Sequence, residues 1–184
     1  FGASAAGAVS VVSALAGDDT SGTGTMLSPV KTMAEGITHA TAIVSAGGTG
    51  VAVYVAGGHY SEKVTMLEGI SLLGGFDCSS LPCTWLRDPA AYDSVIADVD
   101  REGVLAGATI TRQTVIDGFR VMGFGTGLAQ SQLTAAVTVV GGSPTISNNR
   151  LFGDVATSCG TWCSTAALEV RGPTIDPAGP LVTG

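Results

Sequence analysis

Three short apolar runs follow one another closely between residues 51 and 77, and this spacing limits the folds that the chain can adopt. The runs cover residues 51–56, 63–67 and 70–73, and the first alternates valine with alanine or tyrosine, as a strand with two different faces does. The breaks between the runs contain glycine and are too short for a crossover helix, which needs about a dozen residues. The stretch therefore predicts strands joined by abrupt corners, either as antiparallel hairpins or as a coil whose strands stack on the next turn.

An internal repeat favours the coil. Residues 135–154 (AAVTVVGGSPTISNNRLFGD) and 166–184 (AALEVRGPTIDPAGPLVTG) share a small-apolar strand, a glycine, Pro-Thr-Ile and a turn. The period is roughly 20 residues once a loop inserted at about 155–165 is set aside, and such periods are typical of solenoids. Asn148-Asn149 falls at a predicted corner, where asparagine tolerates a left-handed backbone. The positions expected to face inward are Val137, Val139, Ile146 and Leu151.

One amphipathic helix is predicted at about residues 30–46. Ser28 is suited to accept hydrogen bonds from the first free N–H groups of a helix, and Pro29 suits its first position. Gly47-Gly48 would end it. Apolar residues recur at helical spacing at Met33, Ile37, Ala40 and Val44. Because the first turn of a coil exposes core side chains and unpaired backbone groups, we expect this helix to cover that end as an N-terminal cap.

Composition bounds the class of protein. The 184 residues suffice for one domain over residues 1–184, with further inserted loops at about 78–92 and 155–165. The formal net charge is −7 and no cluster of Lys and Arg is present, which argues against nucleic acid and anionic membranes as partners. Although 45% of the residues are apolar, no run of 18 or more apolar residues predicts a membrane-spanning helix.

The four cysteines form two local pairs. Cys78 and Cys83 lie in FDCSSLPCTW, and Cys159 and Cys163 lie in TSCGTWCST. Two disulfides, Cys78–Cys83 and Cys159–Cys163, fit this spacing and an oxidising compartment. Free buried thiols and one zinc site formed by all four cysteines remain as alternatives, since zinc-binding pairs tolerate two to four intervening residues.

Several segments, taken together, resemble a known family. GDDTSGTGTMLSPVKTMAEGITHA, VAVYVAGGHYSEKVTMLEGISLLGGFD, WLRDP, TVIDGFRVMGF and SPTISNNRLFG look like the N-terminal half of a right-handed parallel β-helix of the pectin-lyase-like superfamily, in its bacterial surface-protein branch. The resemblance implies an all-β solenoid with three short parallel strands per turn, an N-terminal capping α-helix, and a secreted, periplasmic or cell-surface location.

The same resemblance raises expectations about the C-terminal end. Few turns are present for this family and no C-terminal cap is evident, so we expect either a fragment of a longer coil or another chain on the open end. A protein partner or self-association at that end is therefore predicted, and a glycan is a further candidate partner.

Candidate reactive residues are few. Asp98, Asp100 and Glu102 form an acidic cluster that could hold calcium, with a solvated corner as the alternative. A second group of candidates consists of His59, Tyr60 and Glu62. They could act in acid–base catalysis, or they could form a polar corner between two strands. The resemblance places Asp117 at a recurrent turn as a structural residue. No catalytic residue, nucleotide site or resident cofactor other than calcium is indicated.

The sequence thus predicts a non-catalytic extracellular β-helix that serves surface display, adhesion or assembly as a scaffold subunit. The alternative is a polysaccharide lyase or glycoside hydrolase that acts on acidic glycans, which would need paired carboxylates on one flank.

Overall fold

The part of the chain that the structure describes consists mostly of parallel β-sheet with one α-helix. The computed structural model describes residues 9–98, 102–123, 133–153, 164–172 and 181–183. Sheet 1 has the order β1 (Val9–Val12), β2 (Val51–Ala56), β5 (Ile70–Phe76), β8 (Val115–Asp117), β11 (Thr145–Ser147) and β14 (Leu181–Thr183). Sheet 2 has the order β12 (Arg150–Gly153), β9 (Phe119–Gly123), β6 (Ser94–Asp98) and β3 (Gly58–Tyr60). Sheet 3 has the order β13 (Ser164–Arg171), β10 (Leu133–Val140), β7 (Glu102–Ala106) and β4 (Val64–Thr65).

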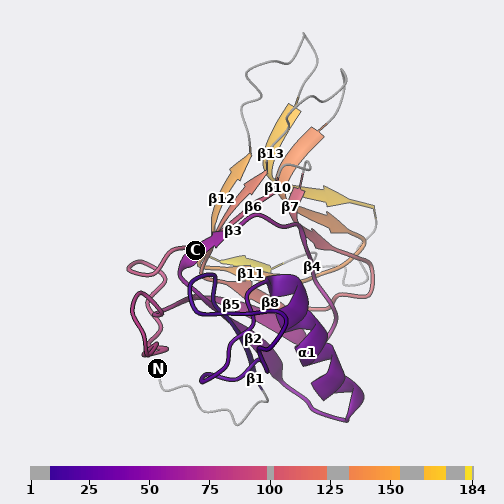
Figure 1. The fold of residues 1–184 in the computed structure, drawn as a ribbon. Coiled ribbons are helices and arrows are strands. Elements are labelled where there is room, and N and C mark those ends of the chain that lie inside the picture. Colours follow the sequence, from indigo (N-terminus) through magenta and orange to yellow (C-terminus); the bar gives the residue numbers. More distant parts are fainter. Residues whose placement is uncertain (1–8, 99–101, 124–132, 154–163, 173–180, 184) are drawn as a thin grey trace.

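From β2 onward the chain passes through sheets 1, 2 and 3 in a fixed cyclic order (Figure 1). We call one such passage a circuit. Each strand pairs in parallel with the strand one circuit later, as β3 does with β6 and β6 with β9. The described strands contain no hairpin pairing, so the antiparallel alternative is wrong, and the arrangement is compatible with an all-β parallel solenoid.

The predicted repeat is confirmed for its first strand. Its later part is wrong, because Leu181 and Val182, which the repeat aligns with Leu151 and Phe152 of β12, pair with Thr145 and Ile146 of β11. Strands β10 and β13 pair in the register that the sequence alignment gives, with Ala135 opposite Ala166 and Val137 opposite Leu168. Because equivalent residues lie above one another, side chains of the same kind stack along the core.

The core contains columns of aliphatic side chains, one from each circuit. In sheet 1 one column runs through Val53, Leu72, Ile116 and Ile146, all of them buried. Val137, Val139 and Ile146 are buried as predicted, while Leu151 is partly buried. This difference arises because Leu151 belongs to the last strand of sheet 2, where no further described strand covers it.

The helix α1 spans Met33–Ser45, so the predicted start near residue 30 is wrong. Val30 is still extended, because its N–H donates to the Val11 carbonyl oxygen at 3.1 Å and its own carbonyl accepts from the Ser13 N–H at 2.9 Å. The N-cap is Thr32, whose hydroxyl accepts from the Glu35 N–H. Pairing with β1 therefore overrides the local helix signal at Ser28-Pro29.

The helix closes one end of the stack of circuits. It packs against β1 and β2, and its buried Met33 and Ala40 join the core. Gly36 permits the close approach, since a Cβ atom there would lie 2.4 Å from Cγ2 of Val12. The outer edge of β1 is also occupied, because the Val11 N–H donates to the carbonyl oxygen of Gly24 at 3.0 Å. We call this side the closed end.

Candidate functional site

The opposite side, which we call the open end, is formed by β12, β13 and β14. Each is the last strand of its sheet, with no described strand on its outer edge. Val182 continues the buried column that passes through Ile146, yet it is 52% exposed. Val170 lies opposite the buried Val139 and is 46% exposed. Side chains that would be core in any earlier circuit therefore face the surface here, together with the exposed Leu181 and Phe152.

Among the described residues, the backbone of the open end lacks a hydrogen-bond partner at defined positions. The Leu181 N–H donates to the Pro144 carbonyl oxygen at 3.1 Å, and the Thr183 carbonyl accepts from the Asn148 N–H at 3.0 Å. Because N–H and C=O groups alternate between the two edges of a strand, those of Val182 face away from β11. Such an edge is a template for another strand.

A charged flank lies at the corners between sheets 1 and 2. Asp117 ends β8, and its carboxylate accepts from the Ser147 hydroxyl at 2.6 Å and the Asn148 side-chain amide at 2.7 Å. The guanidinium of Arg87 forms a salt bridge with the same carboxylate and donates from Nε to the Gly74 carbonyl at 3.0 Å. Asp117 therefore connects its own circuit to the next one through Ser147 and Asn148. Through Arg87 it is also connected to β5 of the preceding circuit, which contains Gly74.

The hydrogen bonds decide the ionisation of Asp117. Partial burial raises the pKa of this carboxyl, but the bonds from Arg87, Ser147 and Asn148 outweigh it, so the pKa lies below the ordinary 3.8. The structural role that the resemblance implied for Asp117 agrees with these contacts. The pairing of Arg87 with its neighbour Asp88, which adjacency suggests, is replaced by the longer-range pair with Asp117.

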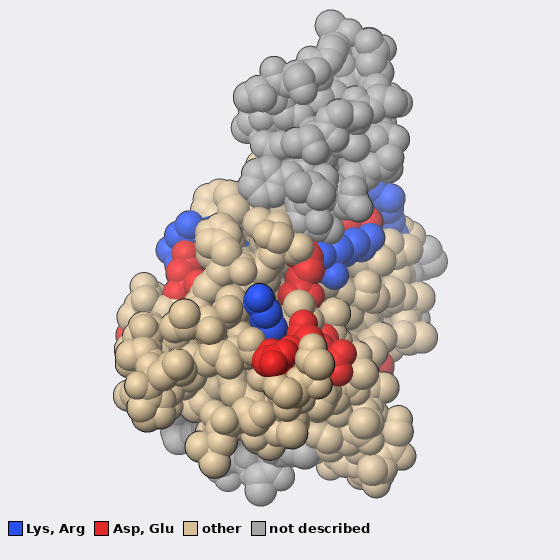
Figure 2. All heavy atoms as spheres, viewed as in Figure 1, with Lys and Arg blue, Asp and Glu red and all other residues tan. Residues whose placement is uncertain are grey.

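A hollow of about 620 Å³ lies beside this salt bridge, and Asn149 and Arg150 form another part of its wall. Asp93 accepts from Arg150 at 2.8 Å and from Arg120 at 2.6 Å, so one carboxylate holds two guanidinium groups that are adjacent in sheet 2. Figure 2 shows one face of the molecule, on which charged side chains are few and basic side chains lie next to acidic ones.

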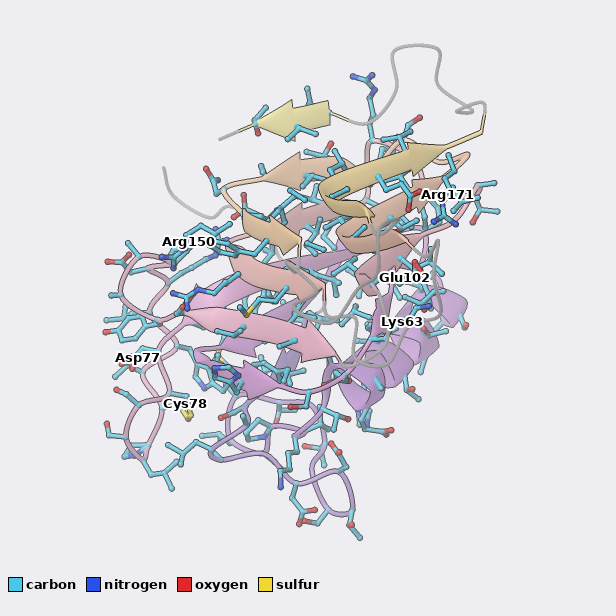
Figure 3. The ribbon with its side chains drawn as sticks, turned by 90° about the horizontal axis from the view of Figure 1, so that it is seen from above. Lys63, Asp77, Cys78, Glu102, Arg150 and Arg171 are labelled. Carbon is cyan, nitrogen blue, oxygen red and sulfur yellow. A yellow bond between two sulfur atoms is a disulfide. The ribbon has the colours of Figure 1, made fainter. Side chains whose placement is uncertain are left out.

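The acidic cluster predicted for calcium is only partly described. Asp100 and the side chain of Asp98 lie outside the described residues, so the calcium site stays a prediction. Glu102 accepts from the Lys63 ammonium at 2.9 Å. Burial raises the pKa of Glu102, but bonds from Lys63 and Thr138 lower it below its ordinary value. Figure 3 shows Lys63, Glu102 and Arg171 following one another along the flank of sheet 3.

His59 and Tyr60 lie in strand β3, and Glu62 follows this strand. The buried Tyr60 hydroxyl donates to the Ala56 carbonyl at 2.9 Å, and burial raises its pKa. The Glu62 carboxylate accepts from the N–H groups of Met33 at 2.8 Å and Ala34 at 3.0 Å, and thereby caps the start of α1. Tyr60 and Glu62 therefore have structural contacts, but the predicted polar corner is wrong for His59 and Tyr60, which belong to a strand.

The predicted loop at 78–92 contains a disulfide between Cys78 and Cys83. This pair is therefore not a set of zinc ligands, while Cys159 and Cys163 lie outside the described residues. The indole Nε1 of Trp85 donates to the Met26 carbonyl at 3.1 Å and ties the loop to the segment before α1. Between the two segments lies an apolar groove of about 530 Å³, at whose edge Leu27 is 97% exposed.

Comparisons with protein families, with curated proteins and with solved structures found no match to this chain.

Within the described residues, no three His, Cys, Asp or Glu side chains gather as a metal site requires. No helix of that part of the chain has the length and apolar character needed to cross a membrane. The sequence analysis predicted an open end of the coil but did not identify the exposed valines or the edge strands that form it. The charged pair Glu169 and Arg171 on β13 was missed, although the repeat carries Thr138 and Val140 at the aligned positions.

Acid should destabilise the fold through these carboxylates. The Glu68 carboxylate accepts from the Thr111 N–H at 2.8 Å and from the Thr114 hydroxyl at 2.7 Å. Asp117 and Glu68 have lowered pKa values because hydrogen bonds to the ionised form outweigh burial. Each contributes stability that is present above the unfolded values of 3.8 and 4.5 and is lost as pH falls through the folded values. We therefore expect the unfolding midpoint in urea to be level from pH 8 to about 5.5 and to fall below about pH 4.5. A level midpoint down to pH 3 would contradict the hydrogen bonds described.

Proposed function

We propose that the chain is a right-handed parallel β-helix of the pectin-lyase-like type that acts outside the cytoplasm as a non-catalytic scaffold. Its role is assembly, adhesion or surface display through a protein partner at the open end. The cyclic order of the three sheets and the repeated register of β10 and β13 support the β-helix. The disulfide Cys78–Cys83 supports an oxidising location, such as the periplasm, the cell surface or the medium.

The observation that carries this proposal is the contrast between the two ends. The closed end has a helix over the core and a loop on the edge of β1. The open end has exposed Val170 and Val182 at the termini of buried columns. Apolar patches beside unpaired strand edges mark interaction surfaces in folded proteins.

The carboxylates of the flanks support the non-catalytic role. A lyase or hydrolase needs acidic or basic groups that are free to reach the sugar, and a general acid needs a raised pKa. Asp117 and Glu102 instead have lowered pKa values and are held by Arg87 and Lys63. These contacts connect neighbouring circuits, and they hold both carboxylates in the ionised state, bound to residues of the same chain.

The second candidate is an enzyme that acts on acidic glycans. It is favoured by the hollow beside Asp117, where the half-exposed Arg150 is placed to meet a uronate carboxylate. The hollow is lined by two arginines and two aspartates, whose charges cancel, and Asp117 is already bound by Arg87; both features weigh against this role.

Cross-linking separates the two functions. A photo-reactive amino acid at Val182 should give adducts with protein on the surface of the producing cells, and the same group at Leu27 should give none. Leu27 is a suitable control because it is also apolar and exposed, but lies before α1. Absence of adducts at Val182 would overturn the scaffold. Depolymerisation of a uronate polysaccharide, with loss of the activity in Arg150→Ala, would establish the enzyme instead.

A further inference from the structure

We propose that the Cys78–Cys83 disulfide is a site of thiol–disulfide exchange, at which the thiolate of a small uncharged thiol attacks Sγ of Cys83 and releases Cys78 as a thiolate. This inference goes beyond the proposed function and does not depend on the open end. Three features of the described residues carry it: the unequal exposure of the two cysteines, a hydrogen bond to one of them, and an apolar groove beside the other.

The two cysteines differ in exposure. Cys78 is only 3% exposed, whereas Cys83 is partly exposed and forms part of the wall of the apolar groove of about 530 Å³. Exchange begins when a thiolate attacks one sulfur of a disulfide, and access is one of the factors that decide which sulfur is attacked. Attack on Cys83 is therefore expected to exceed attack on Cys78.

The hydrogen bonds of Ser13 favour the departure of Cys78. The Ser13 hydroxyl donates to Sγ of Cys78 at 3.2 Å and accepts from the Ala16 N–H at 3.0 Å. The backbone fixes this buried serine, because its N–H donates to the Val30 carbonyl at 2.9 Å and its carbonyl accepts from the Gly17 N–H at 2.8 Å. A hydrogen bond to a charged group stabilises it, and a stabilised thiolate leaves faster. Ser13 is therefore placed to stabilise the thiolate that forms on Cys78.

The thiol is the only reductant that the exchange needs. The incoming thiolate forms a bond to Sγ of Cys83 as the bond between the two cysteines breaks, and the electron pair of that bond passes to Sγ of Cys78. The products are a mixed disulfide on Cys83 and a thiolate on Cys78, which takes a proton from water. A second molecule of the thiol then attacks the small-molecule sulfur of the mixed disulfide and releases the Cys83 thiolate. The protein disulfide is thereby reduced, and the two thiol molecules are oxidised to their own disulfide.

The loop is also held by hydrogen bonds that do not involve the disulfide. The Asp77 N–H donates to the Leu86 carbonyl at 2.8 Å, and the Trp85 N–H donates to the Asp77 carbonyl at 3.0 Å. The Asp77 carboxylate accepts from the hydroxyls of Ser79 at 2.8 Å and Thr84. Because these bonds join the residues that flank the two cysteines, the two thiols of the reduced chain stay close enough to form the disulfide again.

The groove beside Cys83 selects the kind of thiol. The described residues that line it carry no charge and are mostly apolar, among them Met26, Leu81 and Trp85. Its volume lies in the range of small-ligand sites. Moving a charged group into an apolar site costs free energy, and the net charge of −7 repels anions further. An uncharged thiol therefore reaches Cys83 more readily than an anionic one.

Mapping of the first adduct tests the site of attack. The purified, oxidised chain is mixed briefly with β-mercaptoethanol, free thiols are trapped with iodoacetamide, and the peptide that contains both cysteines is sequenced by mass spectrometry. In the folded chain the mixed disulfide should lie on Cys83 at least about ten times as often as on Cys78. The chain unfolded in urea is the control and should give the two adducts about equally, because neither cysteine is buried there. Equal adducts in the folded chain, an excess on Cys78, or no reaction of the folded chain would overturn the inference.

Ser13→Ala tests the role of the hydroxyl. The rate of attack on Cys83 should fall about fivefold, and alkylation of Cys78 in the reduced chain should shift to higher pH, since the thiolate loses a hydrogen bond. Ser80→Ala, at an exposed position of the same loop, is the matched control and should change neither. Circular dichroism verifies that both variants are folded, and the adduct mapping decides the proposal without either of them. An unchanged rate together with an unchanged pH dependence would refute the role of Ser13.

A pair of thiols tests the groove. β-Mercaptoethanol and mercaptoethanesulfonate have the same chain length, but the second carries a negative charge. With the folded chain the anionic thiol should react at least about tenfold more slowly at equal thiolate concentration, whereas with the unfolded chain the two rates should agree within about threefold. Equal rates with the folded chain would show that the groove does not select the thiol and would overturn that part of the proposal.

Discussion

Replacing Asp117 with alanine is expected to lower the free energy of unfolding by about 3 kcal/mol. The substitution leaves the Arg87 guanidinium, the Ser147 hydroxyl and the Asn148 amide without their shared acceptor. The Asp117 side chain is only 10% exposed, so water replaces these contacts incompletely. Urea unfolding followed by circular dichroism measures the change.

A double-mutant cycle isolates the pair. Arg87→Ala alone also breaks the salt bridge, whereas Arg87→Ala combined with Asp117→Ala removes both charges together. The loss in the double variant should therefore be smaller than the sum of the single losses by about 1 kcal/mol or more. Asp88→Ala is the local control, because Asp88 is exposed and, among the described residues, its carboxylate accepts only from nearby N–H groups, at 3.0 Å from Ala90 and 3.3 Å from Ala91. Additive losses from Arg87 and Asp117 would contradict their coupling.

The sequence predicted those features that depend on local pattern. Alternation at Val51–Ala56 predicted a strand, and the repeat placed Val137 and Val139 on the inner face, where both are buried. The corner at Asn148 has the predicted left-handed backbone, with a φ of 51°. In each case the prediction needs only a residue and its neighbours in the sequence.

Contacts between circuits could not be predicted in this way. Arg87 reaches Asp117 because the loop after β5 lies beside the corner of the next circuit in sheet 1, and no periodicity links the two positions. Val30 likewise pairs with β1 although its local sequence favours a helix. The candidate site could not be predicted from local sequence either. Val170 is exposed because β13 is the last described strand of sheet 3, and this position depends on the pairing of distant segments.

Replacing Phe119 with alanine should have the largest effect, a loss of about 4 kcal/mol in the free energy of unfolding. Phe119 begins β9 and is 1% exposed, the largest fully buried side chain among the described residues. Its ring packs against Gly74, where an added Cβ would lie 3.1 Å from Cδ1 of the phenylalanine, so neighbouring atoms are already at contact distance. A rigid corner of this kind collapses poorly around a void, and the cavity adds to the lost transfer free energy.

Phe152→Ala is the matched control for this substitution. Phe152 lies in β12, the neighbour of β9 in sheet 2, and is 48% exposed at the open end. The same change of residue type should therefore cost the monomer less than about 1 kcal/mol. Denaturant unfolding compares the two variants, with Phe119→Leu as an intermediate that refills part of the cavity. Equal losses at both positions would mean that sheet 2 does not separate a packed interior from an open end, because burial alone distinguishes these two phenylalanines.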